Sequence, residues 1–413
     1  MPINAGDTAW VLASGALVLF MTPGLAIFYG GMVRAKSTLN MMMMSFAAMG
    51  VTTILWTLYA YSLAFGKDTG QGFLGNFDNI GLAGTINSVL GASGHEIPSL
   101  AFVMFQLTFA IITVALLSGA IADRAKFSAW LIFVAAWITL VYSPVAHWSF
   151  ASDGWINHKL HALDFAGGTV VEINSGAAAL ALALVLGKRE GFKRDRMRPH
   201  NMPLVLLGAG MLWFGWFGFN AGSALAANHT AALAMINTQI ATAAAVMSWV
   251  GYEKIREGKA TTLGAASGAI AGAVGITPAC GFVTPLGALV IGLLAGAVSA
   301  YGVSLKYKLN YDDSLDVVGV HGLSGIVGML SIGLIATVHA NPLGADGLFF
   351  SGSTALLVKQ FVASIAVLAY SFIVTYLIAL IIQKTIGFRV HRDVEIEGVD
   401  TSIHAESAYE FGR

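Results

Sequence analysis

Residues 163–176 read LDFAGGTVVEINSG, and this stretch decides the fold because its polar pattern returns 149 residues later. The pattern is an aspartate, an ionisable residue eight positions on and then a Ser-Gly pair; it occurs at Asp164, Glu172 and 175–176, and again at Asp313, His321 and 324–325. Ionisable groups inside membrane helices are costly, and they usually pair with each other or line a pathway. Many transporters build one site near the bilayer midplane from an internal repeat of this kind. The pattern therefore predicts a transporter whose pathway is centred on Glu172 and His321.

The composition is typical of a membrane protein. Of the 413 residues, 56% are hydrophobic and 11% are charged, whereas about 25% of an average soluble domain is charged. The formal net charge is zero, so no bulk electrostatic argument favours a nucleic-acid partner. The single cysteine, Cys280, excludes an intrachain disulfide and a thiolate metal cluster. We expect it to be a packed apolar residue and not a reactive thiol, and we expect no metal or cofactor.

Eleven apolar stretches each approach the roughly 20 residues that cross a bilayer as a helix. They are 8–32, 40–65, 99–121, 127–148, 164–187, 202–224, 230–251, 261–279, 283–305, 314–338 and 354–383. The span 261–279 is the least secure, because it is short and holds Thr277-Pro278. The first span has no basic leader, so it is expected to be a retained helix and not a signal peptide. The sequence predicts an all-α polytopic membrane protein, with a transmembrane domain at 1–385 and a polar tail at 386–413.

The basic residues predict the orientation of the chain in the membrane. Nineteen of the 22 Lys and Arg residues lie in the loops after odd-numbered spans or in the tail. By the positive-inside rule, the N-terminus is outside and the C-terminus is cytoplasmic. The span carrying Glu172 then runs inward and the span carrying His321 runs outward, so spans 1–5 and 6–10 are inverted copies and the eleventh is extra. Eight residues rise about 12 Å, which brings both groups towards the middle of a core about 30 Å thick.

The two ionisable residues suggest a proton pathway. A carboxylate and an imidazole can share or relay a proton, and they titrate as a unit when they are close together. The alternative for Glu172 and His321 is a buried structural salt bridge. Asp164 and Asp313 each open a helix, where a carboxylate can cap free N–H groups; direct contact with a ligand is the alternative. Asp316 is expected to be a structural group on the cytoplasmic side.

Aromatic residues supply a second indication. Phe105 and Phe109 share a helix face because they are four residues apart, and Trp216 and Phe219 precede Ser223 in the sixth span. Most aromatic side chains in membrane helices pack against neighbours or lipid. A cation is nevertheless attracted to aromatic faces, and a narrow aromatic constriction excludes hydrated ions. Aromatic rings beside a hydroxyl would suit a small cation that donates hydrogen bonds.

Several long motifs resemble one family, the ammonium transporters (Amt/Mep/Rh), and in particular its bacterial Amt members. The motifs are FYGGMVR at 28–34, FQLTFAIIT at 105–113, LDFAGGTVVEINSG at 163–176, PHNMPLVLLGAG at 199–210, GWFGFNAGSA at 215–224, GAIAGAVGITPACG at 268–281, DVVGVHGLSGIVG at 316–328 and EGVDTSIHAESAYEF at 397–411. The resemblance covers nearly the whole chain. It implies homotrimers in the cytoplasmic membrane, in which each subunit of eleven helices has its own pore.

The resemblance also implies roles for individual residues. External recruitment of ammonium would use Phe109, Phe150 and Ser223, with Asp164 shaping the site from below. Phe109 and Phe219 would form a stacked gate in the pore. Further pore or vestibule positions would be Phe105, Trp216 and Thr277.

Two positions depart from the pattern of the family. Two histidines normally line the centre of the pore, and His321 matches the second, but Glu172 stands in place of the first. Some fungal members resemble this arrangement. The recruitment aromatic, usually a tryptophan, aligns with Phe150, while Trp148 and Trp155 are alternatives for that role.

The expected mechanism is deprotonation of ammonium at the recruitment site, passage of ammonia through an apolar pore, and relay of the proton by Glu172 and His321. Net movement of one positive charge would follow. The alternatives are a channel for neutral ammonia and an ammonium sensor in which conduction is secondary; an enzyme is not expected. Methylammonium is a possible second substrate. The tail resembles the regulatory tail of the family, which implies a nitrogen-signalling partner of the PII class at the cytoplasmic face.

Overall fold

The computed structural model describes residues 3–195 and 197–409. Within these ranges, ten helical stretches are long and apolar enough to cross a membrane, and an eleventh apolar helix, α10 (Thr262–Ile276), is shorter. The all-α polytopic fold is confirmed, and the predicted count of eleven spans is compatible with these helices. The short α10 is the span that the sequence left least secure, and it ends before Pro278.

The spans follow one another along the chain as rods, several of which are broken into shorter helical segments. They comprise α1 (Ala5–Met32); η1 (Ala35–Ser37), α2 (Thr38–Leu55), η2 (Trp56–Ala60) and α3 (Tyr61–Phe65); α4 (Ser99–Leu117) and η4 (Ser118–Ile121); α5 (Phe127–Trp137), η5 (Ile138–Tyr142), α6 (Ser143–Phe150) and, beyond a turn, η6 (Trp155–Leu160); η7 (Gly168–Ile173) and α7 (Asn174–Leu186); α8 (Met202–Gly222); α9 (His229–Glu257); α10; α11 (Pro285–Gly302) and α12 (Leu305–Leu309); η8 (Val318–Leu323) and α13 (Ser324–Ile335); and α15 (Ala355–Thr385).

The remaining elements lie at the two ends of the rods. They are η3 (Ile80–Leu82), strands β1 (Val89–Leu90) and β2 (Ile97–Pro98), α14 (Leu348–Ser351), α16 (Arg392–Glu397) and η9 (Asp400–His404). The two strands pair antiparallel, with Val89 opposite Pro98.

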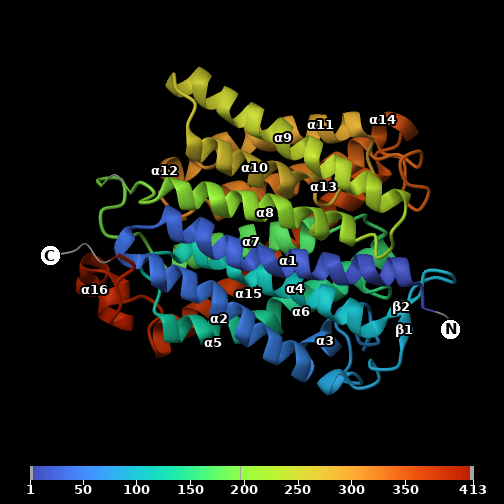
Figure 1. Ribbon diagram of the computed structural model, residues 1–413, viewed down its shortest axis with the longest axis horizontal. Helices are drawn as coiled ribbons and strands as arrows, with labels where there is room; N and C mark the ends of the chain where they lie inside the picture. Colours follow the sequence, from blue (N-terminus) through green and yellow to red (C-terminus); the bar gives the residue numbers. More distant parts are fainter. Residues whose placement is uncertain (1–2, 196, 410–413) are drawn as a thin grey trace.

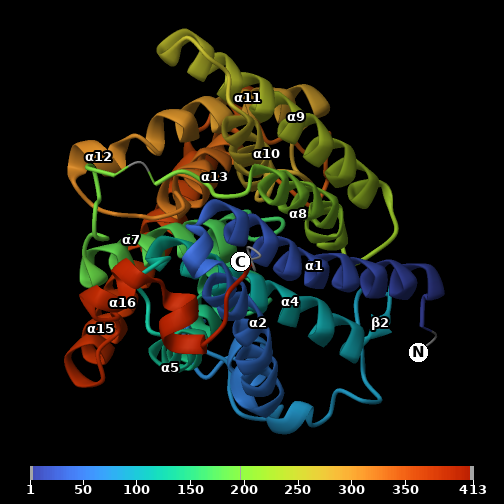
Figure 2. The same ribbon diagram turned by 60° about the vertical axis from the view of Figure 1, so that its left-hand side comes forward.

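The rods lie roughly along the long axis of the molecule, with α1 between α8 and α4 and with α9, α10 and α11 grouped on one side (Figure 1). The N-terminus, β1, β2 and α14 lie at one end, which we call the N-terminal end (Figure 1). The C-terminus, α12 and α16 lie at the opposite end, the tail end, which Figure 2 brings forward. Termini at opposite ends are compatible with the odd number of spans expected from the sequence.

Local sequence signals explain where the rods begin. Asparagine side chains accept backbone N–H bonds at the starts of α1, α8 and α9, and threonine side chains do so at the starts of α10 and α11. These residues are preferred N-caps because their oxygens satisfy N–H groups that lack a helical partner. Two predicted starts, 164 and 314, were wrong by four residues, since helical structure begins at Gly168 and Val318. The aspartates before those starts are instead used to hold the first turns, as described below.

Candidate functional site

The two repeat segments cross in the middle of the molecule at glycines. A Cβ on Gly176 would lie 2.2 Å from the Cα of Gly322, and a Cβ on Gly325 would lie 2.8 Å from the Cβ of Glu172. The contact therefore moves backward from α7 into η7 as it moves forward from η8 into α13, so the two segments run antiparallel. This arrangement supports the inverted repeat that the sequence predicted. The absence of side chains at these glycines lets the two backbones touch.

Glu172 and His321 meet beside this crossing. His321 Nδ1 lies 2.8 Å from Glu172 Oε2, so the imidazole and the carboxyl group share one hydrogen bond. The side chain of Glu172 is fully buried, and His321 is 4% exposed. Both residues sit on π-helical turns, η7 and η8, which are often found inside helices at functional sites. The second carboxylate oxygen of Glu172, Oε1, has no hydrogen-bond partner among the described residues.

The pair faces a very small cavity, which we call the pore cavity. Its volume is about 10 Å³, close to the space that one water molecule occupies. Its lining consists of Met21, Leu25, Phe28, Ile112, Leu116, Val171, Glu172, Leu212, Trp216, Phe219, Ile270 and His321. Apart from the Glu172–His321 pair and the indole of Trp216, these side chains are purely apolar. A neutral molecule of about the size of water fits this cavity, whereas a hydrated ion does not.

The two phenylalanines predicted to form the gate lie against each other above the pore cavity. The rings of Phe109 and Phe219 have centroids 4.1 Å apart, at an angle of 33°. Phe105 packs against Phe109 at 4.9 Å. All three rings are at most 1% exposed, and of the three only Phe219 lines the pore cavity. The contact between Phe109 and Phe219 is what a closed aromatic constriction requires, although the role of gate stays a prediction.

Trp216 is held in place by a buried polar chain that sequence reasoning only partly found. Its indole N–H donates to the hydroxyl of Thr277 at 2.9 Å, and that hydroxyl lies 3.1 Å from Asn220 Oδ1. The amide of Asn220 in turn donates to Thr238 at 2.9 Å. Thr277 therefore orients the indole and does not itself line the pore cavity. The role of Asn220 in this chain was not predicted from the sequence. The one indication of it was the presence of a polar residue within an apolar span.

The residues predicted to recruit ammonium lie on the N-terminal side of the gate. The ring of Phe150 stands edge-on to Phe109, with centroids 6.2 Å apart. The hydroxyl of Ser223 donates to the carbonyl of Phe219 at 2.8 Å, which leaves its oxygen lone pairs available to a donor. Trp148 and Trp155 instead pack against each other at 5.7 Å, and Trp148 lies 4.6 Å from Tyr370. The geometry thus favours Phe150 over the two tryptophans as the recruitment aromatic.

The two repeat aspartates hold the turns that precede the π-helical segments. Asp164 Oδ1 accepts the backbone N–H of Gly167 and Gly168, while Oδ2 accepts both the N–H and the hydroxyl of Thr169. Asp313 Oδ2 accepts the N–H of Val318 at 2.7 Å. Both aspartates therefore accept backbone N–H groups, as expected if they cap the start of a helix. Thr169 also bonds the hydroxyl of Ser149 at 3.0 Å, so Asp164 is linked through these two residues to the neighbour of Phe150 in the chain.

Buried charges cluster at the tail end. The carboxylate of Asp312 accepts three N–H bonds of 2.8–2.9 Å from Arg189. Burial alone would raise the pKa of Asp312, but the hydrogen bonds and charge of Arg189 lower it. Arg124, also fully buried, donates to the carbonyl of Asp312 at 2.7 Å. Asp316 pairs with Lys306 at 2.6 Å, as a structural group on that side would.

The tail folds back onto this end of the molecule (Figure 2). Asp400 accepts the backbone N–H groups of Leu39 and Asn40 at 2.9 and 2.8 Å, and so caps α2 from a distant part of the chain. Glu395 accepts the N–H of Glu190 and pairs with Arg389, both at 2.7 Å. Burial raises the pKa of Asp400. The last two residues of the tail motif, 410 and 411, lie outside the described residues.

In the described ranges, no three His, Cys, Asp or Glu side chains come close enough to hold a metal ion. Cys280 is fully buried and its thiol donates weakly to the carbonyl of Thr277. Such an environment is that of a packed side chain, since reactive cysteines sit in partly exposed, electropositive surroundings.

Comparisons with known proteins agree on one family. The model of the Ammonium Transporter Family matches residues 9–409. An ammonium transporter of Mycobacterium tuberculosis is 54% identical over an alignment 434 positions long, which covers 99% of this chain and 91% of that protein. The crystal structure of Saccharomyces cerevisiae Mep2 superposes with a TM-score of 0.86 at 33% identity and covers 94% of this chain and 91% of that one.

A second solved structure, described as a sensor Amt protein, has a TM-score of 0.88 at 27% identity, and the match covers 96% of this chain and 98% of that one. The curated relatives are named as transporters and not as enzymes. This multi-pass membrane protein therefore belongs to the ammonium transporter family.

Proposed function

We propose that the protein carries ammonium across the cytoplasmic membrane by separating it into ammonia and a proton. Ammonium is recruited at Phe109, Phe150 and Ser223, and it loses its proton before it enters the pore. Ammonia crosses the pore cavity, and the proton is relayed by Glu172 and His321. The observation that carries this proposal is the hydrogen-bonded Glu172–His321 pair in an otherwise apolar cavity of about 10 Å³.

The size and lining of the pore cavity explain why the proton would separate from ammonia. Moving an ion into an apolar environment without compensating partners is far more costly than moving a neutral molecule. Because ammonia is neutral, it enters the apolar cavity at little cost. The released proton can move along two titratable groups that already share a hydrogen bond. On the inner side, ammonia takes up a proton again, so one positive charge moves for each ammonium. Potassium cannot give up a proton, and this difference would provide selectivity.

Two other functions remain alternatives. In a channel for neutral ammonia, the Glu172–His321 pair would be structural and no charge would cross. In an ammonium sensor, conduction would be secondary; the likeness to a sensor Amt structure favours keeping this option.

Currents from purified protein in liposomes distinguish these functions. We expect an ammonium concentration jump to evoke a transient current in protein-containing liposomes, whereas potassium should evoke none. A change of internal pH without current would support the neutral channel. The absence of both signals would contradict transport, and methylammonium should be tested in the same way as a second substrate.

The orientation and the assembly belong to the same proposal. The N-terminal end faces outward and the tail end faces the cytoplasm, because the basic loops gather at the tail end. The subunits form homotrimers embedded in the lipid bilayer. The tail binds a PII-class signalling protein, and its contacts with α2 and Glu190 support a role in presenting that surface.

A pull-down with the cognate PII protein tests the role of the tail. Full-length protein should retain the partner, and a variant without residues 390–413 should not. The point variant Asp400→Ala, which loses the bonds to Leu39 and Asn40 without shortening the chain, should weaken retention. Equal retention by all three proteins would show that the tail is not part of the docking site.

A further inference from the structure

A space much larger than the pore cavity lies at the N-terminal end, and we call it the aromatic chamber. The chamber has a volume of about 430 Å³, whereas the pore cavity has about 10 Å³. A single ammonium ion needs only a small part of such a space. Volumes of roughly 300–1,000 Å³ with mostly apolar walls are typical of sites for organic molecules.

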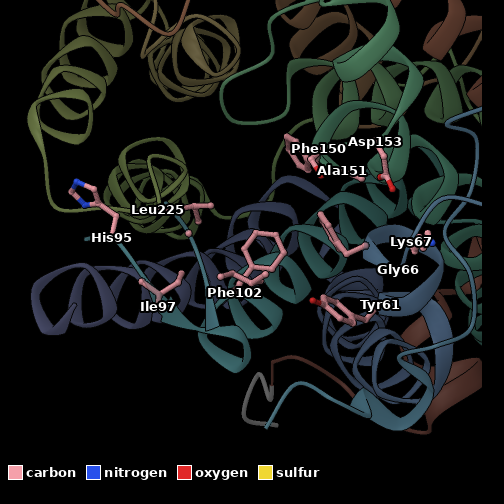
Figure 3. A pocket seen from close by; sticks show the side chains of 14 residues that line it. Tyr61, Gly66, Lys67, His95, Ile97, Phe102, Phe150, Ala151, Asp153 and Leu225 are labelled. Atoms are coloured by element: carbon pink, nitrogen blue, oxygen red, sulfur yellow. The ribbon is translucent and has the colours of Figure 1, made fainter. Parts of the chain in front are cut away.

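The walls of the chamber are rich in aromatic rings. Tyr61, Phe65, Phe102 and Phe150 all line it (Figure 3). Phe65 meets Phe102 edge-on at 5.0 Å, and Tyr61 stacks on Phe65 at 5.7 Å, so three of these rings form one continuous wall. Flat aromatic or short aliphatic groups pack favourably against such walls.

The chamber adjoins the proposed recruitment site. Phe150 belongs to both, because it lines the chamber and its ring lies 6.2 Å from that of Phe109. Leu225, two residues beyond Ser223, lines the chamber as well. A cation held at Ser223 can therefore extend an attached group into the chamber without entering the gate.

The charged residues define which way such a molecule would lie. Lys67 and Leu225 lie on opposite sides of the Phe102 ring (Figure 3). A cationic group beside Lys67 would be repelled, whereas the Ser223 side offers a hydroxyl oxygen and aromatic faces. Asp153, near Lys67, already accepts the backbone N–H of Asp68. The cationic end thus belongs at the recruitment site and the apolar end against Phe102 and Phe65.

We propose that the aromatic chamber binds primary ammonium ions that carry an aryl group, and that these ions block the transporter from the N-terminal side. This inference rests on the proposed recruitment of ammonium at Ser223. An aryl group cannot follow the ammonium inward, because the rings of Phe109 and Phe219 lie 4.1 Å apart and the cavity behind them holds one water-sized molecule. The bound ion therefore competes with ammonium and is not transported.

The probe is 2-phenylethylammonium, with neutral 2-phenylethanol as the control for simple apolar binding. Calorimetry on the purified protein in detergent should show binding of the cation that ammonium chloride displaces, and no comparable binding of the alcohol. In liposomes the cation should raise the half-saturating ammonium concentration without lowering the maximal current. A lack of binding, or equal binding of the alcohol, would overturn the proposal.

Variants locate the binding to the chamber. Phe102→Ala should weaken binding of 2-phenylethylammonium about two- to tenfold, the range expected for loss of one aromatic contact, with little change for ammonium itself. Phe349→Ala, on exposed α14, is the matched control and should leave both unchanged. If Phe102→Ala does not fold, Phe102→Leu replaces it. Equal binding by the Phe102 and Phe349 variants would place the cation elsewhere and overturn the proposal.

The calorimetric measurement separates this inference from the proposed function. If ammonium evokes a current but the aryl cation does not bind, the chamber inference alone fails. If the cation binds and depends on Phe102 while no current or pH change is seen, transport fails and the binding site stands.

Discussion

The segments η7–α7 and η8–α13 share a backbone arrangement and differ in how their leading aspartates are used. Both oxygens of Asp164 are occupied, by three backbone N–H groups and one hydroxyl. Only one oxygen of Asp313 accepts a bond, and its Oδ1 has no hydrogen-bond partner among the described residues. The repeat thus places the backbone symmetrically, while the aspartate on the N-terminal side makes four hydrogen bonds and the one on the tail side keeps an oxygen that is unpartnered within the described ranges. Glu172 opposite His321 continues that asymmetry into the pore.

The largest effect is expected where the two segments touch. Gly176→Ala puts a Cβ about 2.2 Å from the Cα of Gly322, and a backbone atom cannot move aside as a flexible side chain can. Overpacking of this kind costs roughly 1–3 kcal/mol or more, so we expect little folded protein. Gly210→Ala is the control, because a Cβ there meets nothing within 4 Å. Similar yields and melting temperatures for the two variants would contradict the close crossing.

A second substitution compares the aspartates directly. In the wild type each oxygen of Asp164 accepts two hydrogen bonds. In Asp164→Asn an NH₂ group replaces one of these oxygens, so two donors lose their acceptor, and unsatisfied buried groups cost about 1–3 kcal/mol each. In Asp313→Asn the amide oxygen can still accept the N–H of Val318, and the NH₂ can take the place of the unpartnered oxygen. We therefore expect a large fall in melting temperature for Asp164→Asn and a small change for Asp313→Asn. The reverse order would contradict the comparison.

The unequal aspartates also predict a pH dependence. Burial, followed by the charge of Asp316, raises the pKa of Asp313 to about 6. The folded protein then holds this proton more tightly than the unfolded chain, so the stabilisation is complete below the ordinary value of 3.8 and is lost as pH rises through about 6. One pKa unit corresponds to about 1.4 kcal/mol, which gives up to about 3 kcal/mol. Melting temperatures from pH 4 to 7 should fall more for the wild type than for Asp313→Asn; parallel curves would contradict this.

The smallest effect is expected at the recruitment aromatic. Phe150→Trp offers a stronger cation–π surface, worth about 0.5–1 kcal/mol, so the half-saturating ammonium concentration should fall about two- to fivefold. Liposome currents over a range of ammonium concentrations measure it. If Phe150→Trp has no effect while Trp148→Ala or Trp155→Ala raises that concentration, the recruitment aromatic is one of the tryptophans.

Much of the architecture could be predicted because bilayer physics leaves few options. Apolar length set the spans, and the polar repeat identified Glu172 and His321, which the structure brings within hydrogen-bond distance. The helix starts at 164 and 314 were wrong because hydropathy does not register that Asp164 and Asp313 cap turns outside the helix.

Other features depend on contacts that no local pattern contains. The capping of α2 by Asp400 joins residues about 360 positions apart. The Asn220 link between Thr277 and Thr238 depends on the packing of three helices. The aromatic chamber around Phe102 likewise depends on segments that lie far apart in the sequence. These features follow from tertiary packing, so spacing in the sequence did not reveal them.

The central claim is that Glu172 and His321 relay the proton. The most direct measurement is the ammonium-evoked current of Glu172→Gln in liposomes, compared with wild type at equal protein density. Glutamine keeps the size of the side chain and can still form a hydrogen bond with Nδ1 of His321, but it cannot take up the proton. We predict that the current falls to the level of protein-free liposomes while the melting temperature stays close to that of the wild type. A wild-type current in Glu172→Gln would contradict the relay.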